Sequence, residues 1–258
     1  MILLLDVGNT RMKWAWLEGG TLSPSRAVRH HGAPNAWAEE LEEWQADLAT
    51  EGLSPERIVV SNVAGGTFAR LLGGWSKARL GLWPEFVTSE ARQCGITNGY
   101  STPSMLGVDR WLGLVGARGH TPGPACIVNA GTAVTVDALT AAGAHLGGFI
   151  LPGMQLMQES LYGRTGNVAA AAESEPARVE GLYGVNTAGA IEGGILLSLA
   201  TLAERVCEDL RVRGDGAPVL LLTGGDAPLL KACLRLPSVT VPDLVLEGLA
   251  AVAGSRAP

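Results

Sequence analysis

The sequence lacks the cysteine and histidine patterns of metal-binding and disulfide-linked proteins. Its four cysteines, at positions 94, 126, 207 and 233, are scattered, and no CxxC pair is present. The four histidines form neither an HExxH motif nor another ligand spacing. These absences exclude a zinc knot and a disulfide framework. We expect the cysteines to be buried as small apolar residues in a reducing compartment, and the histidines to lie on the surface or in loops.

Long hydrophobic runs and an excess of positive charge are also missing. No segment reaches about 18 uncharged apolar residues, the length that a membrane span requires. The opening MILLLDVGNT has no basic region and meets Asp6 after a short apolar run, so we expect a strand there rather than a signal peptide. A net charge of −6 argues against a general nucleic-acid or acidic-membrane surface. We predict a cytoplasmic protein that binds neither membranes nor nucleic acid.

Three common signatures of nucleotide binding and nucleophilic catalysis are absent. The chain contains no GxxxxGK[ST], no GxGxxG and no GxSxG motif, which disfavours a P-loop, a Rossmann site and a hydrolase elbow. What is present is the composition of a packed protein, with 47% hydrophobic residues among 258. This length fits one large domain or two domains of about 100–150 residues.

The chain repeats one pattern in its two halves. Residues 2–5 form an apolar run that ends at Asp6, and a turn and an alternating strand follow. Residues 125–139 repeat this order of strand, turn and strand, with Asn129 aligned on Asp6 and Gly131 on Gly8. Each unit is followed by a further strand, loop and helix, near residues 57–72 and after residue 219. We predict an α/β fold of two duplicated domains that face one cleft.

Helical spacing and turn residues complete this outline. Residues 35–49 and 187–210 carry apolar side chains at helical spacing. Ser104, after Thr102 and Pro103, is a plausible N-cap of a helix that ends near Gly119. The segment 120–124 contains two prolines and a glycine, so we expect the domain boundary there, between domains 1–119 and 120–258.

The first candidate site is the turn after the first strand. An acidic residue at the end of a strand, next to glycine and hydroxyl groups, can hold a hydrated magnesium ion beside phosphate oxygens. Backbone N–H groups of such a turn form an anion nest, and Lys13 adds a positive charge. An ordinary hairpin turn is the alternative. The residues of this turn are Asp6, Val7, Gly8, Asn9, Thr10, Arg11, Met12 and Lys13.

A second candidate is the segment Gly107, Val108, Asp109 and Arg110. Asp109 shares a helix face with Gly113 and Gly116, which leaves room for a ligand or for a closely packed helix. Arg110 points elsewhere and could bind a carboxylate through two hydrogen bonds. The alternative is an exposed Asp–Arg pair on an amphipathic helix.

Two further turns lie in the second half. Residues 129–137, NAGTAVTVD, form a second phosphate-type turn, and residues 222–226, LTGGD, contain paired glycines that allow backbone to approach a flat ligand such as adenine. Either segment could equally be a structural turn.

Taken together, these motifs resemble the type III pantothenate kinases. The resemblance comprises DVGNTRMK at the start, Tyr100 followed by GVDR, NAGTAVTVD, GGFILPG, NTAGAIEGG and LTGGDA, in this order over nearly the whole chain. It implies the actin-like ATPase (ribonuclease H-like) fold, a homodimer, and the ATP- and magnesium-dependent phosphorylation of pantothenate that begins coenzyme A synthesis.

The resemblance also implies roles for individual residues. The turn from Asp6 to Lys13 and Thr132 correspond to ATP phosphate contacts, with Asp6 on the magnesium side. Asp109 corresponds to the catalytic base. The pantothenate contacts correspond to Tyr100, Gly107, Val108, Asp109, Arg110 and Thr187. A carboxylate that accepts the proton of a primary alcohol, and positive charges on the phosphates, are what this reaction requires.

One position departs from the family pattern. Members usually carry Asp where this chain has Asn129, and that Asp helps to bind a potassium or ammonium ion. An uncharged amide oxygen binds a cation more weakly, so the monovalent-cation site is in doubt. Two alternatives therefore stay open: a regulatory binding protein and an actin-like kinase for another small alcohol such as a sugar.

Overall fold

The chain divides into two compact units. The structure, a computed structural model, describes residues 1–29, 37, 41, 44–45, 48, 52, 54–166, 168, 170, 174–214 and 216–255. Unit 1 comprises Met1–His120 and Asp243–Pro258, and unit 2 comprises Thr121–Pro242. The split between His120 and Thr121 lies at the start of the segment 120–124, where the domain boundary was expected. The sequence predicted domains 1–119 and 120–258, but residues 243–258 belong to unit 1 rather than to the second domain, because the C-terminal helix packs within unit 1.

Unit 1 is built on a mixed sheet in the order β3-β2-β1-β5-β6, with β4 also paired to β2. Strand β1 pairs antiparallel with β2 and parallel with β5. The strands are β1 (Ile2–Val7), β2 (Arg11–Glu18), β3 (Thr21–Leu22), β4 (Arg26–Arg29), β5 (Arg57–Asn62) and β6 (Glu85–Phe86). The remaining elements are α2 (Gly66–Leu80), β7 (Arg92–Gln93), β8 (Ile96–Thr97), a 3₁₀ turn (Pro103–Met105), α3 (Val108–His120) and α8 (Leu244–Ser255).

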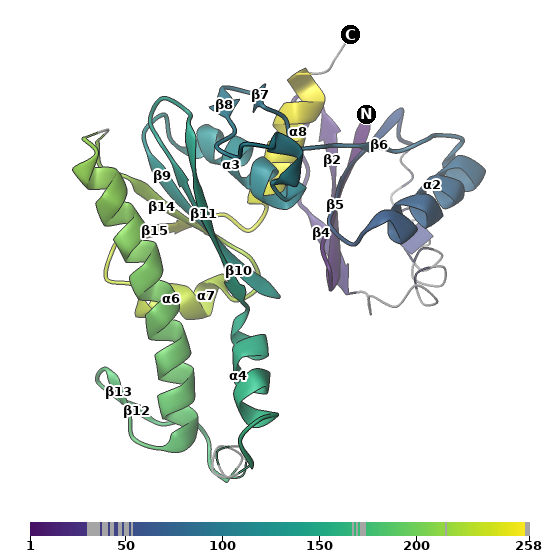
Figure 1. Cartoon of the computed structure of the whole chain (residues 1–258). Helices are drawn as coiled ribbons and strands as arrows, with labels where there is room; N and C mark the ends of the chain where they lie inside the picture. Colours follow the sequence, from purple (N-terminus) through teal and green to yellow (C-terminus); the bar gives the residue numbers. More distant parts are fainter. Residues whose placement is uncertain are drawn as a thin grey trace. The chain divides into compact units, whose positions relative to one another are not determined.

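Side chains alternate along β1, so one face of the strand points into the core and the other carries the candidate site. Leu3, Leu5 and Val7 are fully buried in one cluster with residues of α2. The described part of segment 35–49 joins this cluster through Trp37, Leu41, Trp44 and Leu48, all helical and buried as predicted; the rest of that segment lies outside the described residues. Asp6, two residues after Leu4, points to the opposite face. In Figure 1, α2 covers one face of the sheet while α3 and α8 cover the other.

Glycines let α3 and α8 approach at backbone distance. A Cβ on Gly116 would overlap the carbonyl oxygen of Leu244, and one on Gly248 would overlap the carbonyl oxygen of Leu112. The glycine at position 116 therefore serves a closely packed helix rather than a ligand. This contact keeps the C-terminal helix in unit 1.

Unit 2 repeats the topology of unit 1. Its sheet has the order β11-β10-β9-β14-β15, and β9 pairs antiparallel with β10 and parallel with β14, just as β1 pairs with β2 and β5. The strands are β9 (Ala125–Ala130), β10 (Ala133–Leu139), β11 (His145–Pro152), β14 (Val219–Thr223) and β15 (Ser238–Thr240). Because β1 and β9 have the same pairing pattern with their neighbours, Asn129 occupies in β9 the position that Asp6 occupies in β1. The duplication predicted from the sequence is confirmed.

Three helices pack on one face of the second sheet, as Figure 1 shows for α6. They are α4 (Met154–Tyr162), α6 (Thr187–Val212) and α7 (Ala227–Cys233), and a short hairpin, β12 (Val179–Glu180) with β13 (Tyr183–Gly184), contacts α6. The predicted helix over 187–210 is confirmed. Among the described residues, no helix is both long enough and apolar enough to cross a membrane.

Several local expectations are wrong. Helix α2 continues past residue 72 to Leu80 and ends only at Gly81, whose φ of 72° forms a left-handed cap. His145 is not a surface or loop histidine, because it is buried in β11 and its Nε2 lies 2.9 Å from Asp137 Oδ1. Cys126 and Cys207 are buried as expected, whereas Cys94 and Cys233 are partly exposed.

Candidate active site

Asp6 lies on the site face of β1 between two polar neighbours. In the sheet register its partners are Lys13 on β2 and Ser61 on β5, so all three side chains share one face. Burial is the main cause that raises the pKa of Asp6 from 3.8 to about 6, and the neighbouring Ser61 hydroxyl opposes this rise. The negative charges of Asp109 and Asp243 raise this pKa further, and Lys13 lowers it. Two further carboxylates therefore lie within electrostatic reach of Asp6 in unit 1.

The turn after Asp6 is held by a backbone hydrogen bond. The Gly8 N–H donates to the carbonyl oxygen of Arg11 at 3.0 Å. Asn9, Thr10 and Arg11 are exposed, whereas Val7 and Met12 are buried in the core. Of the turn residues selected from the sequence, Val7 and Met12 can therefore offer a ligand only their backbone.

Lys13 contacts a residue from the far end of the chain. Its Nζ donates to Asp243 Oδ1 at 3.2 Å, and Ser25 Oγ lies 2.8 Å from both carboxylate oxygens of Asp243. Asp243 directly precedes α8, and its carbonyl oxygen accepts the N–H of Glu247 at 2.9 Å. The start of α8 is thereby attached to β2.

Asp109 lies in the first turn of α3. The prediction that this helix starts at Ser104 is wrong: a 3₁₀ turn covers Pro103–Met105, Leu106 is extended, and α3 begins at Val108. The Asp109 carboxylate folds back over the helix start, where Oδ1 accepts the N–H of Arg110 at 2.8 Å. A Cβ on Gly107 would lie 2.8 Å from this oxygen, so glycine leaves the space that the carboxylate occupies.

Arg110 is buried rather than part of an exposed ion pair, with 6% of its surface exposed. Its Nη1 donates to the hydroxyl oxygen of Tyr100 at 2.8 Å, and its Cζ lies 5.6 Å from the centre of the Tyr100 ring. Tyr100 is itself positioned by Asn98, whose side-chain oxygen accepts the Tyr100 N–H at 3.0 Å. Tyr100 and Arg110, both selected from the sequence, are thus in direct contact, and the Arg110 guanidinium is held against the Tyr100 ring.

Asn129 and Thr132 flank the corresponding turn of unit 2. The Gly131 N–H donates to the carbonyl oxygen of Ala133 at 3.2 Å, which repeats the bond made by Gly8. A Cβ on Gly153 would overlap the carbonyl oxygens of Gly131 and Thr132, and one on Gly224 would lie 2.7 Å from Asn129 Oδ1. The GGFILPG and LTGGDA segments therefore close around this turn, and Gly224 serves a structural contact.

Thr187 is the first residue of α6. Asn186 caps this helix, since its side-chain oxygen accepts the N–H of Gly189 at 2.8 Å. The same oxygen accepts the N–H of Arg178 at 3.0 Å, which attaches the β12–β13 region to the helix start. Thr187 thus lies at the start of α6, beside the hairpin.

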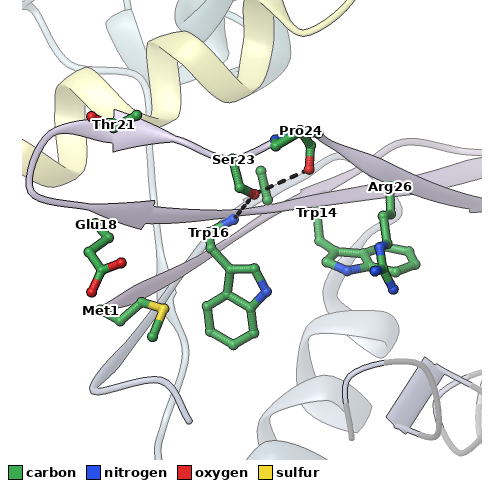
Figure 2. A pocket seen from close by; sticks show the side chains of 9 residues that line it. Met1, Trp14, Trp16, Glu18, Thr21, Ser23, Pro24 and Arg26 are labelled. Atoms are coloured by element: carbon green, nitrogen blue, oxygen red, sulfur yellow. Dashed lines mark hydrogen bonds between the residues drawn. The ribbon is translucent and has the colours of Figure 1, made fainter. Parts of the chain in front are cut away.

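A separate pocket of about 420 Å³ lies in the first sheet (Figure 2). It is lined by Trp14, Trp16, Glu18 and Arg26 among others, and none of the site residues selected from the sequence lines it. Because side chains alternate along β2, Trp14 and Trp16 face away from Lys13. This pocket does not belong to the candidate site.

Sequence reasoning missed Ser61, Asp243, Asn98 and Asn186. Ser61 lies near the end of β5, a strand parallel to β1, so the repeat already held a signal for it. Asp243 carried only the weaker signal of an acidic residue before an apolar helical segment. Among the described residues, no group of three or more His, Cys, Asp or Glu side chains is arranged to hold a metal ion.

Comparison with known structures identifies the fold. A Baf family transcriptional activator from Campylobacter jejuni aligns with a TM-score of 0.57 and 18% identity, covering 98% of both chains. The ethanolamine utilization protein EutJ from Carboxydothermus hydrogenoformans aligns with a TM-score of 0.54 and 12% identity, over 97% of this chain and 89% of that one. At such identities the likeness shows the fold alone, which is that of the actin-like ATPases.

Sequence comparison identifies the family. The type III pantothenate kinase model matches residues 2–209. The type III pantothenate kinases of Nitrosococcus oceani and Azoarcus sp. are each 39% identical to this chain, covering 98% and 100% of it and 94% and 92% of their own lengths. The chain therefore belongs to the type III pantothenate kinase family, and its activity is the ATP-dependent phosphorylation of pantothenate that begins coenzyme A synthesis.

Proposed function

We propose that the turn from Asp6 to Lys13 binds the phosphate groups of ATP and that Asp109 accepts the proton of the pantothenate hydroxyl. The observation that carries this proposal is the convergence of Asp6, Lys13 and Asp109 on one face of unit 1. Backbone N–H groups after Gly8 and the ammonium of Lys13 would hold phosphate oxygens. Thr132 is exposed in the equivalent turn of unit 2, and its phosphate contact stays a prediction from the family resemblance.

Asp109 is suited to general-base catalysis by its position. Its carboxylate is oriented by the Arg110 N–H and belongs to a rigid helix start. A base within hydrogen-bonding reach of a hydroxyl raises the rate by about 10²–10⁴-fold. Arg110, held by Tyr100, would bind the pantothenate carboxylate, and Gly107 and Val108 would be further substrate contacts. A contact by Thr187 stays a prediction from the family resemblance.

The charges around Asp6 fit a divalent cation. The carboxylates of Asp109 and Asp243 and the ammonium of Lys13 all act on the Asp6 carboxylate, so negative charge exceeds positive charge among these four groups. Mg²⁺ in phosphate-binding sites is usually held by one or two carboxylates, several waters and the phosphates themselves. Asp6 would be that carboxylate, and the ion would neutralise phosphate charge when bound. A monovalent cation near Asn129 has the weaker donor set described above.

We propose in addition that two copies form a homodimer through unit 2. Strand β11 is the edge of its sheet as described, and Phe149 and Ile150 on it are 52% and 65% exposed. Other exposed large apolar residues of unit 2 are Leu146, Leu156, Leu161, Val179, Leu182, Tyr183, Val185, Leu197, Val212, Leu229, Leu236 and Val239. Apolar surface of this kind marks protein interfaces. Light scattering during size-exclusion chromatography tests it: Phe149→Asp should yield the monomer mass if this surface forms the dimer.

The test of the proposed site is a coupled ADP-release assay with pantothenate against a panel of sugars, in the parent chain and in Asp6→Asn. ADP release with pantothenate alone, lost in the variant, supports the assignment. Release with a sugar instead of pantothenate would support a kinase for another alcohol. Pantothenate or ATP binding without release would support a regulatory protein. A cytoplasmic location stays a prediction.

A further inference from the structure

We propose that Asp243 is a positioning residue for pantothenate phosphorylation, holding the Lys13 ammonium in place for the phosphate groups of ATP. The proposal rests on the assignment of Lys13 to the phosphate site. Asp243 lies beyond residues 2–209, the part of the chain that the family model matches. Its role follows from contacts within unit 1.

The contacts join three segments that are distant in sequence. Asp243 Oδ1 accepts from Lys13 Nζ at 3.2 Å, and Ser25 Oγ, from the segment between β3 and β4, lies 2.8 Å from both carboxylate oxygens. The Lys13 and Asp243 side chains are 23% and 28% exposed, so the pair is largely shielded from solvent. Ser25 fixes the carboxylate, and the carboxylate fixes the ammonium.

Lysine needs such support to act at a defined point. Its ammonium ends a flexible four-carbon stem that can adopt many rotamers. An ammonium has three N–H groups, so the bond to Asp243 sets its direction without using its whole capacity. Since Lys13 is the cross-strand neighbour of Asp6, its ammonium is kept beside the proposed phosphate turn.

A metal-ligand role for Asp243 fits less well. Both of its carboxylate oxygens already accept hydrogen bonds, from Ser25 and Lys13. Within the described residues, no cluster of three or more metal-binding side chains forms around it. The carboxylate therefore acts through Lys13 rather than on an ion.

The test is a double-mutant cycle of Lys13→Met and Asp243→Asn, with kcat and KM measured for both substrates. We expect Asp243→Asn to lower kcat/KM for ATP about tenfold or more, with the KM for pantothenate unchanged. In the Lys13→Met background the same change should cost less than about twofold, because its target is already gone. Asp243→Glu should restore part of the loss. Glu247→Gln, which removes one negative charge from the same helix, is the matched control and should behave as the parent.

Three outcomes would overturn the proposal. An equal loss in both backgrounds would show that Asp243 acts independently of Lys13. A lower KM for ATP in Asp243→Asn would show that Asp243 holds Lys13 away from the phosphates. Normal turnover of Lys13→Met would show that Lys13 does not belong to the phosphate site. If Lys13→Met is strongly impaired but shows no coupling to Asp243→Asn, Lys13 keeps its place in the phosphate site and only the positioning role of Asp243 is ruled out. Ser25→Ala, which leaves the start of α8 intact, should give a smaller loss of the same kind even if Asp243→Asn fails to fold.

Discussion

At the scale of single residues, Asp6 combines a functional position with a cost in stability. The pKa of Asp6 is about 6 in the folded protein and 3.8 in the unfolded chain. As the pH falls, the metal-free folded protein therefore takes up a proton at Asp6 at a higher pH than the unfolded chain does. The stability that protonated Asp6 contributes is complete below pH 3.8 and is lost as the pH rises through 6. The difference is at most about 3 kcal/mol, because a change of one in pKa corresponds to about 1.4 kcal/mol.

The first prediction concerns Asp6→Asn, whose side chain cannot ionise. We expect turnover to be largely lost and pantothenate binding to change less. Without metal, the variant should be more stable than the parent near pH 7.5, and the gain should vanish by about pH 4. Urea unfolding in EDTA at several pH values measures this. A stability difference that does not change with pH would contradict the raised pKa.

The second prediction concerns Asp109→Asn. The amide keeps the oxygen that accepts the Arg110 N–H but cannot take up the substrate proton. We expect kcat to fall about 10²–10⁴-fold with an unchanged melting temperature. Steady-state kinetics and thermal unfolding of the same preparation separate the two effects. Loss of activity through unfolding alone would assign Asp109 to the structure of the helix start.

The third prediction concerns Arg110→Lys. Lysine lacks the planar guanidinium that lies on Tyr100 and can bind a carboxylate through two bonds. The KM for pantothenate should rise while the KM for ATP stays near the parent value. Tyr100→Phe, which removes only the hydroxyl bonded to Nη1, should shift the KM for pantothenate in the same direction by less. An unchanged KM for pantothenate in Arg110→Lys would remove Arg110 from the substrate site.

At the scale of elements, the fourth prediction concerns the α3–α8 contact. Gly248→Ala places a Cβ on the carbonyl oxygen of Leu112, and overpacking costs about 1–3 kcal/mol or more. This outweighs the gain of up to about 1 kcal/mol from alanine's helix propensity. Gly254→Ala is the control, since its Cβ would meet nothing within 4 Å. Urea unfolding should show a clear loss for position 248 and none for 254; equal behaviour would contradict the close packing.

Elements with strong local signals were predictable from the sequence. The two strand–turn–strand units and the helix over 187–210 carry clear apolar patterns, and they form as expected. Features that depend on tertiary contacts were not. The start of α3 is set by the Asp109 carboxylate over Gly107, and the place of α8 by glycine contacts with α3. The same holds for the candidate site: the turn and the GVDR segment were visible, whereas Asp243 becomes a partner of Lys13 only after folding.

At the scale of the whole molecule, the two units keep one topology with different charges. The sheet neighbours of Asp6 are Lys13 and Ser61, and the corresponding neighbours of Asn129 are Thr135 and Thr223. Unit 1 thus carries the ionisable side chains of Asp6 and Lys13 where unit 2 carries only neutral side chains. The duplicated frame has one charged turn and one uncharged turn.

The fifth prediction follows from this difference. The family resemblance implies Asp at position 129 and a role for it beside the ATP phosphates, where its negative charge would require a monovalent cation. With Asn the repulsion is absent and the cation loses its best ligand, so activity should depend weakly on potassium or ammonium. Asn129→Asp should create or sharpen that dependence and lower activity in sodium-only buffer. The measurement is a titration of potassium and ammonium against both forms at fixed ionic strength. Strong activation of the unmodified enzyme would contradict the prediction, because other ligands, such as backbone carbonyl oxygens, would then complete the cation site without a carboxylate.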